Sequence, residues 1–592
     1  MTRYRLSGAV MTHPKRRAAA ESLAQAAPPG ALRVVMDPDP AGRPSVLRTA
    51  LCAWSAIEDG ATHQLVVQDD MILSDTFFER ARAAIEEMPD AALALFALWD
   101  SRNGAAVRFG AMTGARWVGA VNEYFPCVAI ILPRRVADGF VAFGRRHLDS
   151  WPDDILMYRY LRANGIPSYV SVPSLAEHED HGSISGNAFR GPRRSVCFLP
   201  SDMPGREETR LTGLNVLPFF KHGVAQCAVR LDGPDPGRWL HLDCAQYLEG
   251  CGVRVERLQS AIAGMAEAAT PAAAKGTWLT AFTMGFVQRR EGLGRAGEPD
   301  PEVLAEALAT VGPGGISYAQ PEERIAELRD ELARIARAGV EAGGEAAGRP
   351  RTRRTAAGPC RVGVLGAGTP LGEHLVRGLA DDGHQVTALG PGRQAEQTLD
   401  AVLDLTALGA APGADGSRIT LNSPSREGVC IVRTGDLYGP GCPHDSRIGR
   451  MVWDALRSRP LTFEEPPGAL LRPLHTSDLI GGLSAMLRTP PSERAIGLAD
   501  AATCTVAEMA QAVRKAVRPV PIADRAAPSE APGPHAKEAA WPSLPPGWKA
   551  TTDLTYGLHT YAQWLAYEGI HGAPDAYPWA LGHKTRPGRS AG

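Results

Sequence analysis

The sequence has little of several features that would place it quickly in a functional class. Its formal net charge is only −2, from 63 Lys and Arg against 65 Asp and Glu residues. This balance offers no electrostatic reason to expect nucleic acid or an anionic membrane as a partner. No apolar run approaches the length of a membrane span, and the N-terminus turns polar at residues 11–17, too soon for a secretory signal. We therefore expect a cytoplasmic protein without a membrane span that binds no nucleic acid.

The sequence also contains no C-x-x-C pair, although it has ten cysteines. Scattered cysteines in a cytoplasmic chain indicate reduced and mostly buried thiols. They do not indicate a zinc site or a disulfide framework.

The chain is long enough for several domains. Its 592 residues exceed what one hydrophobic core usually supports, and its 44% hydrophobic and 22% charged content is that of an ordinary globular protein. Residues 1–235 alternate apolar runs with amphipathic patterns, which predicts an α/β domain. The expected strands are residues 6–11, 31–37, 63–70, 91–100, 127–133 and 168–174, and the expected helices are residues 16–26, 45–60 and 76–88.

The remaining chain divides into three parts by composition. Residues 236–342 have a helical pattern and are expected to form a spacer or an interaction region. Residues 343–359 are rich in Gly, Ala, Pro and Arg and are expected to be a flexible linker. Residues 360–592 begin with a strand, a glycine-bearing turn and a helix, which predicts a second α/β domain of the Rossmann type.

One apolar run of the first domain ends in two adjacent carboxylates, Asp69 and Asp70, preceded by Gln68. Like charges side by side repel, so a pair placed near a core needs a compensating partner. Carboxylate oxygens are the ligands that Mg²⁺ and Mn²⁺ prefer. The alternative is that the two residues end the strand in solvent and cap the next segment of the chain.

Residues of the same domain suggest a nucleotide site. Thr12, His13 and Arg16 lie in a turn between an expected strand and helix, where helix N–H groups and basic side chains can meet a phosphate. Asp37 ends the next strand and can accept hydrogen bonds from a base or a ribose. A basic helix start with no ligand is the alternative for this turn.

Two later segments carry further polar residues. Asp153 and Asp154 follow Pro152 at the start of an expected helix, and His178 and His181 lie in the sequence HEDHGS. Asp is a preferred N-cap residue, so the acidic residues have a structural alternative. A histidine-bearing polar loop can equally be exposed to solvent.

In this order, the elements of roughly the first 200 residues resemble the GT-A-fold glycosyltransferases. The resemblance implies that Asp70, with Asp69, holds Mn²⁺ or Mg²⁺, and that His178 or His181 is a late metal ligand. It implies that Asp154, with Asp153 as second choice, is the base. The sequence departs from the family at Gln68, where many members carry an acid.

The function that this resemblance implies is transfer of a sugar from a nucleoside diphosphate donor to a hydroxyl or an amine. A cation would offset the charge that develops on the leaving diphosphate, and a carboxylate would take the acceptor's proton. With one base and in-line attack, the anomeric configuration inverts. Thr12, His13, Arg16 and Asp37 would surround the nucleotide. The sequence identifies neither the donor nor the acceptor.

The last domain resembles the NAD-dependent epimerase/dehydratase family, the extended short-chain dehydrogenases. Gly366, Gly368 and Gly372 match its cofactor turn, with Thr369 in place of the middle glycine of the pattern. Residues 400–407 resemble the strand that flanks the cofactor, and residues 429–441 resemble the segment Arg-x-x-x-x-Tyr-Gly-Pro-Gly.

Three departures from this second family predict a shortened, non-catalytic domain. None of the twelve tyrosines is followed by a Lys four residues later, although that pair is the family's base. Only about twenty residues separate the strands that should flank the helix carrying the pair. The second strand ends near Gly390 and Arg393, without the acid that would hold the ribose of NAD(P). The alternatives are an NAD(P)-dependent nucleotide-sugar epimerase or dehydratase, and a non-enzymatic nucleotide-binding scaffold.

Overall fold

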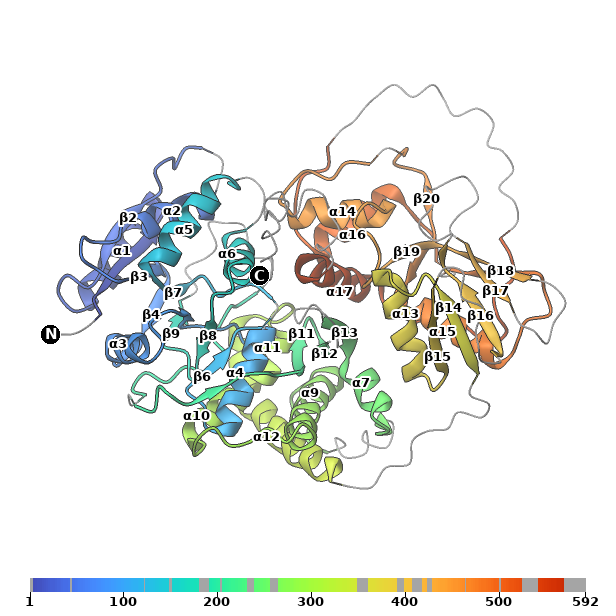
Figure 1. Cartoon of the computed structure of the whole chain (residues 1–592), viewed down its shortest axis with the longest axis horizontal. Coiled ribbons are helices and arrows are strands. Elements are labelled where there is room, and N and C mark those ends of the chain that lie inside the picture. Colours follow the sequence, from blue (N-terminus) through green and yellow to red (C-terminus); the bar gives the residue numbers. More distant parts are fainter. Residues whose placement is uncertain are drawn as a thin grey trace, which may run out of the picture. The chain divides into compact units, whose positions relative to one another are not determined.

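The computed structural model divides the chain into two compact units, Met1–Arg353 and Arg354–Gly592 (Figure 1). The structure describes residues 4–42, 45–121, 123–148, 152–179, 191–202, 205–230, 239–255, 264–348, 360–390, 399–406, 418–422, 429–463, 465–499, 502–523 and 541–568. The ten cysteines are free thiols.

The first unit is built on an eight-stranded sheet in the order β10-β6-β8-β5-β7-β3-β1-β2. Strand β1 is parallel to both of its neighbours, β2 and β3, whereas β7 is antiparallel to β3 and β5. All six strands expected from the sequence are present in this sheet. Its strands are β1 (Leu6–Thr12), β2 (Arg33–Met36), β3 (His63–Gln68), β5 (Ala92–Ala94), β6 (Trp117–Gly119), β7 (Ala129–Pro133), β8 (Ser168–Ser171) and β10 (Arg210–Leu211).

Helices flank this sheet, and their ends follow from local chemistry. Helix α2 begins after Ser45, whose hydroxyl accepts a hydrogen bond from Arg48 N, and helix α4 begins after Ser101, whose hydroxyl accepts one from Gly104 N. Helix α4 ends at Gly114, where φ is +73°. The helices are α1 (Arg17–Ala26), α2 (Val46–Ser55), α3 (Phe77–Glu87), α4 (Arg102–Thr113), α5 (Arg134–Arg145) and α6 (Asp153–Ala163).

A short antiparallel pair brings a distant segment to the end of β3. Strand β4 (Met71–Leu73) follows the acidic pair directly and pairs with β9 (Ala176–His178), in a register that sets Met71 opposite His178. This pairing carries the late histidine back to Asp69 and Asp70.

Residues 236–342 were expected to be helical, and this is wrong for residues 239–243. Residues Trp239–Asp243 form strand β13, which pairs with β12 (Val224–Arg230) beside β11 (Val216–Lys221). Its first four residues are all buried, and the strand is only five residues long, with the next helix beginning directly at Cys244. Helices follow: α7 (Cys244–Gly250), α9 (Pro271–Arg290), α10 (Pro301–Ala309), α11 (Val311–Ile316) and α12 (Glu322–Ala347).

Helix α12 also differs from the expectation at its C-terminal end. It continues through Ala347 and therefore enters the segment 343–359 that was expected to be a flexible linker. Gly343 is buried, and a side chain there would meet the Phe282 carbonyl oxygen of α9 at 1.9 Å. Close packing against α9 thus extends the helix despite its glycine content. Residues 349–359 of that segment lie outside the described residues.

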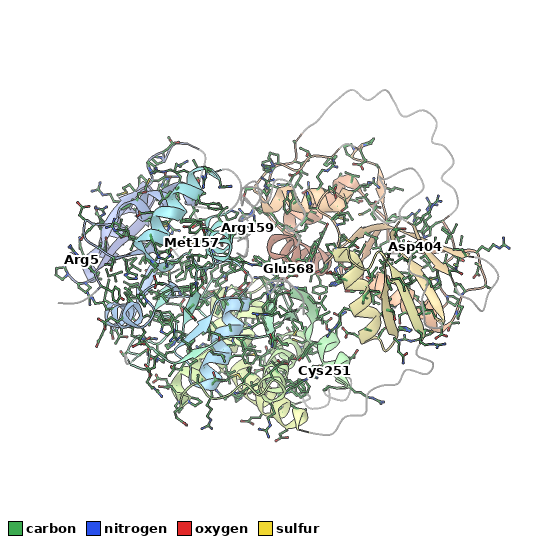
Figure 2. All side chains as sticks on the ribbon, viewed as in Figure 1. Arg5, Met157, Arg159, Cys251, Asp404 and Glu568 are labelled. Atoms are coloured by element: carbon green, nitrogen blue, oxygen red, sulfur yellow. The ribbon has the colours of Figure 1, made fainter. Side chains whose placement is uncertain are left out.

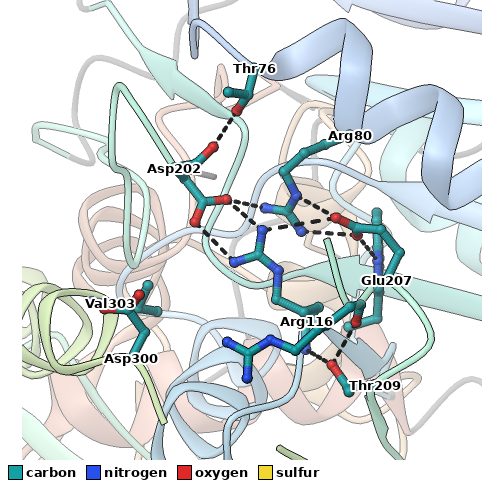
Figure 3. Close-up of polar contacts among 10 residues, drawn as sticks. Thr76, Arg80, Arg116, Asp202, Glu207, Thr209, Asp300 and Val303 are labelled. Atoms are coloured by element: carbon teal, nitrogen blue, oxygen red, sulfur yellow. Dashed lines mark hydrogen bonds and ion pairs between the residues drawn. The ribbon is translucent and has the colours of Figure 1, made fainter. Parts of the chain in front are cut away.

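A buried ion network joins Asp202 and Glu207 to helix α3 and to the start of strand β6. Arg80 on α3 donates to Asp202 (2.7 Å) and to Glu207 (2.9 and 3.1 Å), and its side chain is fully buried. Arg116 donates two further hydrogen bonds to Asp202 (2.9 and 2.8 Å), and Trp117 Nε1 donates to Glu207 (2.6 Å). Figure 3 shows both arginines pointing toward the same two carboxylates. Each buried charge is thereby paired with an opposite charge.

The second unit is a mixed α/β domain with a six-stranded sheet in the order β15-β14-β16-β17-β18-β22. Strand β17 is antiparallel to β16 and β18, whereas the other neighbours are parallel. An antiparallel strand therefore lies where the family pattern calls for a helix and a parallel crossover. The strands are β14 (Arg361–Leu365), β15 (Gln385–Leu389), β16 (Ala401–Asp404), β17 (Arg418–Asn422), β18 (Val429–Thr434) and β22 (Ala495–Leu498).

Helices and three short strand pairings complete the described structure of this unit. The helices are α13 (Pro370–Asp381), α14 (Arg447–Leu456), α15 (Thr476–Arg488), α16 (Val506–Ala516) and α17 (Leu554–Tyr567). Strand β19 (Asp436–Tyr438) pairs with β21 (Pro473–His475), β20 (Leu470–Leu471) pairs with β23 (Cys504–Thr505), and Leu461 forms an isolated bridge with Ile522. No helix in the described part of the chain combines the length and apolar character needed to cross a bilayer.

Candidate functional site

The first unit has a topological switch point between β1 and β3. The chain leaves β1 to form β2 on one side and later returns to form β3 on the other side. In open α/β sheets, the loops after two such strands diverge and leave a crevice at the carboxyl ends. Thr12 ends β1 and Asp69 follows β3, so both lie at this edge.

Five side chains meet at this edge, and we call them the acidic cluster: Thr12, Arg16, Asp69, Asp70 and His178. Arg16 Nη1 lies 3.2 Å from Asp69 Oδ1 and 2.8 Å from Asp70 Oδ2. His178 Nε2 lies 3.3 Å from Asp70 Oδ2, and the Thr12 hydroxyl donates to Asp69 Oδ2. The structure therefore brings together residues from the first turn, the end of β3 and the end of β9.

The two carboxylates of the acidic cluster differ in electrostatic character. Burial raises the pKa of Asp69, and the neighbouring Asp70 charge adds to this effect. Burial acts in the same direction on Asp70, but hydrogen bonds and charge interactions with His178 and Arg16 outweigh it and lower the pKa of Asp70. Asp70 is therefore the carboxylate that stays ionised more readily, and a single guanidinium faces both carboxylates.

The acidic cluster suits a Mg²⁺-type site, in which waters and phosphates supply part of the coordination, better than a site whose metal ligands all come from the protein. Among the residues that the structure describes, no group of three or more His, Cys, Asp and Glu side chains is placed to hold a metal ion. However, Asp70 Oδ1 is buried without a hydrogen-bond partner, as is His178 Nδ1. Mg²⁺ is usually bound through one or two carboxylates together with waters and substrate phosphates. Asp69 and Asp70 would supply the protein ligands, whereas His181 lies outside the described residues.

The acidic residues of α6 approach the same edge of the sheet. Strand β7 runs antiparallel to β3, so the residues just before β7 lie beside the end of β3, where Gln68 N donates to Val128 O (2.8 Å). The charges of Asp153 and Asp154 both act on the neighbouring Cys127 thiol and contribute to its raised pKa, which arises mainly from burial. This places the start of α6 near the crevice.

Asp153 and Asp154 are not equivalent. Asp153 is 8% exposed, and burial, with the adjacent charge of Asp154, raises its pKa to about 7. Asp154 is less buried, and its Oδ1 accepts a hydrogen bond from Ile155 N at 2.7 Å. A carboxyl that titrates near neutrality suits proton transfer. Asp153 is therefore the member of the pair whose pKa is shifted toward neutrality. The expectation that Asp154 is the base, with Asp153 as second choice, stays a prediction.

The other residues expected around a nucleotide have structural partners. Asp37 accepts two hydrogen bonds from Arg48, both of 2.8 Å, which lower the pKa of this carboxyl. The ring of His13 accepts a hydrogen bond from Lys15 N at 3.2 Å and caps the 3-10 helix η1 (Pro14–Arg16). Asp37 lies at the carboxyl end of β2, one strand away from the acidic cluster.

Sequence reasoning missed the residues that hold the late histidine in place. Arg194 Nη1 donates to the His178 carbonyl oxygen, and Nε and Nη2 of the same side chain pair with Glu322 on α12. Glu177 accepts from Ser195 N and from the Ser195 hydroxyl, both at 2.8 Å. No local pattern marks these contacts because each joins segments at least 16 residues apart.

The second unit has its own switch point between β14 and β16, where the glycine turn lies. Gly366 has φ +82°, a conformation that favours glycine. A side chain at Gly372 would meet the Gly366 carbonyl oxygen at 2.2 Å, whereas Gly368 has no heavy atom within 4 Å of its ideal Cβ. Thr369 caps α13 by accepting a hydrogen bond from Gly372 N at 3.0 Å.

The end of β16 lies across this switch point. Asp404, labelled in Figure 2, accepts hydrogen bonds from Thr406 N (2.9 Å) and from the Thr406 hydroxyl (2.6 Å). It is the acidic side chain that ends the strand beside the glycine turn. Arg393 lies outside the described residues.

Comparisons with known proteins give partial structural likenesses. The sequence matches no protein-family model and no curated protein. Among solved structures, a UDP-glucose 4-epimerase from Thermotoga maritima, solved with UDP-glucose, is 12% identical with a TM-score of 0.27, covering 35% of this chain and 98% of its own. An epimerase from Methanothermobacter thermautotrophicus is 14% identical with a TM-score of 0.26, covering 35% and 92%.

A third structure, the Bordetella bronchiseptica enzyme WbmF with NADH, is 16% identical with a TM-score of 0.18. The match covers 23% of this chain and 44% of WbmF, so the chain spans less than half of that enzyme. Two of these neighbours are epimerases and the third is an enzyme solved with NADH, and each matches only part of the chain. Identities and TM-scores this low assign neither a family nor an activity. The comparisons give no support to the GT-A resemblance of the first unit.

Proposed function

We propose that the first unit is a metal-dependent glycosyltransferase that moves a sugar from a nucleoside diphosphate donor to a hydroxyl or an amine. The observation that carries this proposal is the buried acidic pair at the switch point between β1 and β3, with Asp70 Oδ1 lacking a partner. A bound Mg²⁺ or Mn²⁺ would neutralise charge on the leaving diphosphate. We also propose that the first unit has the GT-A fold.

The remaining residues have roles that follow from their positions. The carboxylate of Asp153 would take the proton of the acceptor, whose oxygen or nitrogen forms a bond to the anomeric carbon as the bond to the diphosphate breaks. Its raised pKa near 7 supports this role, with Asp154 as the second candidate. The turn with Thr12, His13 and Arg16 would meet the phosphates, and Asp37 would lie nearer the nucleoside.

The test is slow hydrolysis of UDP-, dTDP- and GDP-sugars by the full chain in the presence of Mn²⁺ or Mg²⁺. We expect metal-dependent hydrolysis of one donor and a loss of about 100-fold in Asp70→Asn. Asp90→Asn is the matched control, because Asp90 is a 76% exposed carboxylate paired with Arg135. Hydrolysis that is equal in both variants would remove the acidic pair from the reaction.

The second candidate function is binding of NAD(P) or a nucleotide sugar by the second unit. The glycine turn at its own switch point favours this candidate, and two of the named neighbours were solved with UDP-glucose or NADH. An NAD(P)-dependent epimerase activity is less well supported, because this sequence lacks the Tyr/Lys pair that serves as the base of that family. A rise in the melting temperature with NADP(H), together with no response to donors and metal, would favour this candidate over the transferase.

A further inference from the structure

Arg16 occupies an unusual place for a residue expected to meet phosphate. It ends the 3-10 helix η1 and is followed at once by α1, so its backbone lies in the turn after β1. Its side chain is only 14% exposed and reaches back to the end of β3. The guanidinium therefore faces the protein's own carboxylates.

One nitrogen of Arg16 contacts both members of the acidic pair. Nη1 lies 3.2 Å from Asp69 Oδ1 and 2.8 Å from Asp70 Oδ2, the oxygen that His178 Nε2 also approaches at 3.3 Å. A pair of ionised carboxylates carries two negative charges and Arg16 supplies one positive charge. One negative charge remains uncompensated by the arginine, and Asp70 Oδ1 remains without a hydrogen-bond partner.

This arrangement opposes cation binding in the absence of a second ligand. A divalent cation would be attracted by the remaining charge, but it would be repelled by a guanidinium nitrogen only 2.8 Å from Asp70. Moving Arg16 away without a new acceptor would leave a poorly hydrated, partly buried cation unpaired. A diphosphate changes this balance, because its oxygens are strong acceptors for a guanidinium.

We propose that Arg16 is an exchangeable counter-ion of the acidic pair. It offsets one of the two negative charges of Asp69 and Asp70, and it transfers to the donor's diphosphate when a divalent cation takes its place on the carboxylates. This inference rests on the proposed function and adds a coupling to it: cation and nucleotide each promote binding of the other. Such coupling is reciprocal and is typically between about 5-fold and 150-fold.

The test measures Mn²⁺ binding directly by isothermal titration calorimetry and by the electron paramagnetic resonance signal of free Mn²⁺, with and without UDP, GDP or dTDP. For the wild type we expect weak binding of Mn²⁺ alone and about 5-fold or more tighter binding with the preferred nucleotide. In Arg16→Gln we expect tighter binding of Mn²⁺ alone and a smaller gain from the nucleotide. Wild-type affinity for Mn²⁺ alone in this variant would overturn the inference.

The matched control is Arg17→Gln, which removes the neighbouring positive charge. Arg17 is 66% exposed and pairs with Glu21 at 2.7 Å, so its loss should leave Mn²⁺ binding at the wild-type level. If both variants change the affinity for Mn²⁺ equally, the effect comes from the net positive charge of the region, and the role of Arg16 as counter-ion is wrong. If Arg16→Gln does not fold, Arg16→Met retains most of the aliphatic stem and carries the same expectations.

Asp70→Asn separates failure of the inference from failure of the proposed function. If Mn²⁺ binding requires Asp70 but does not respond to Arg16, the metal site stands and the counter-ion role is wrong. If neither wild type nor any variant binds Mn²⁺, with or without nucleotide, the metal-dependent transferase is wrong and the inference falls with it.

Discussion

His178 Nε2 lies 3.3 Å from Asp70 Oδ2, so the end of β9 and the end of β3 meet at one carboxylate. The β4-β9 pairing produces this contact by setting Met71 opposite His178. Together with Arg16 it lowers the pKa of Asp70 against the effect of burial. The arrangement supports predictions that separate roles in function from roles in stability.

The raised pKa of Asp153 predicts an unusual dependence of stability on pH. Its folded pKa is raised to about 7 by burial and by Asp154, whereas an unfolded aspartate titrates near about 3.9. Between these values the folded state binds a proton that the unfolded state has released, so stability falls as pH rises through this window. The variant Asp153→Asn does not titrate and therefore does not lose stability in this way. The free energy of unfolding of the variant, relative to that of the wild type, should rise by about 1–3 kcal/mol between pH 5 and pH 8.

Urea unfolding at both pH values measures this difference, with Asp90→Asn as an exposed control. A difference between Asp153→Asn and wild type that does not change with pH would mean that Asp153 is ionised in the folded protein at pH 5.

The buried ion network of Figure 3 predicts that loss of one of its arginines strongly lowers the stability of the first unit. Arg80→Met removes a fully buried guanidinium and leaves Asp202 and Glu207 with less compensation. We expect a loss of about 3–5 kcal/mol in the free energy of unfolding of the first unit. Arg135→Met removes an arginine whose ion pair with Asp90 is exposed and should cost less than about 1 kcal/mol.

Chemical denaturation followed by tryptophan fluorescence reports on this network, because Trp117 donates to Glu207. Equal stabilities of the two variants would mean that Arg80 contributes no more than a surface ion pair.

The glycine turn of the second unit predicts a contrast between two neighbouring glycines. Gly372→Ala would place a methyl group 2.2 Å from the Gly366 carbonyl oxygen, whereas Gly368→Ala meets nothing within 4 Å. We expect Gly372→Ala to destabilise the second unit by about 1–3 kcal/mol because the turn must shift, and Gly368→Ala to change its stability by less than about 1 kcal/mol. Differential scanning calorimetry of both variants checks this contrast, and similar melting curves would contradict the tight turn.

Two buried histidines predict acid sensitivity of the second unit. Burial lowers the pKa values of His374 and His475 to about 4, whereas an unfolded histidine titrates near about 6.5. Between these values the unfolded state binds more protons, so stability is lost as pH falls from about 6.5 toward about 4. Each histidine should contribute up to about 1.4 kcal/mol per pH unit.

His374→Gln should reduce this slope, which thermal unfolding of the second unit at about pH 4.5, 5.5 and 6.5 would measure. His444, which is not among the buried polar residues, provides the control His444→Gln. An unchanged slope in His374→Gln would contradict a neutral, buried His374.

The fold of the first unit could be read largely from local patterns. Its buried strands, such as β1 and β3, appear as short apolar runs, and Ser45 marks the start of a helix through its capping hydroxyl. The strand β13 was missed because it is only five residues long and runs directly into helix α7. The end of α12 was missed because packing of Gly343 against α9 overrides its low helix propensity.

The order of the residues is enough to show that two carboxylates follow an apolar strand and that a glycine turn opens the second unit. Which side chains these carboxylates meet depends on how distant strands pair. The parallel pairing of β1 with β3 sets Arg16 beside Asp69 and Asp70, and the β4-β9 pairing adds His178. Burial at the start of α6 separates Asp153 from Asp154. Contacts and desolvation of this kind join segments far apart along the chain, so no local pattern of residues encodes them.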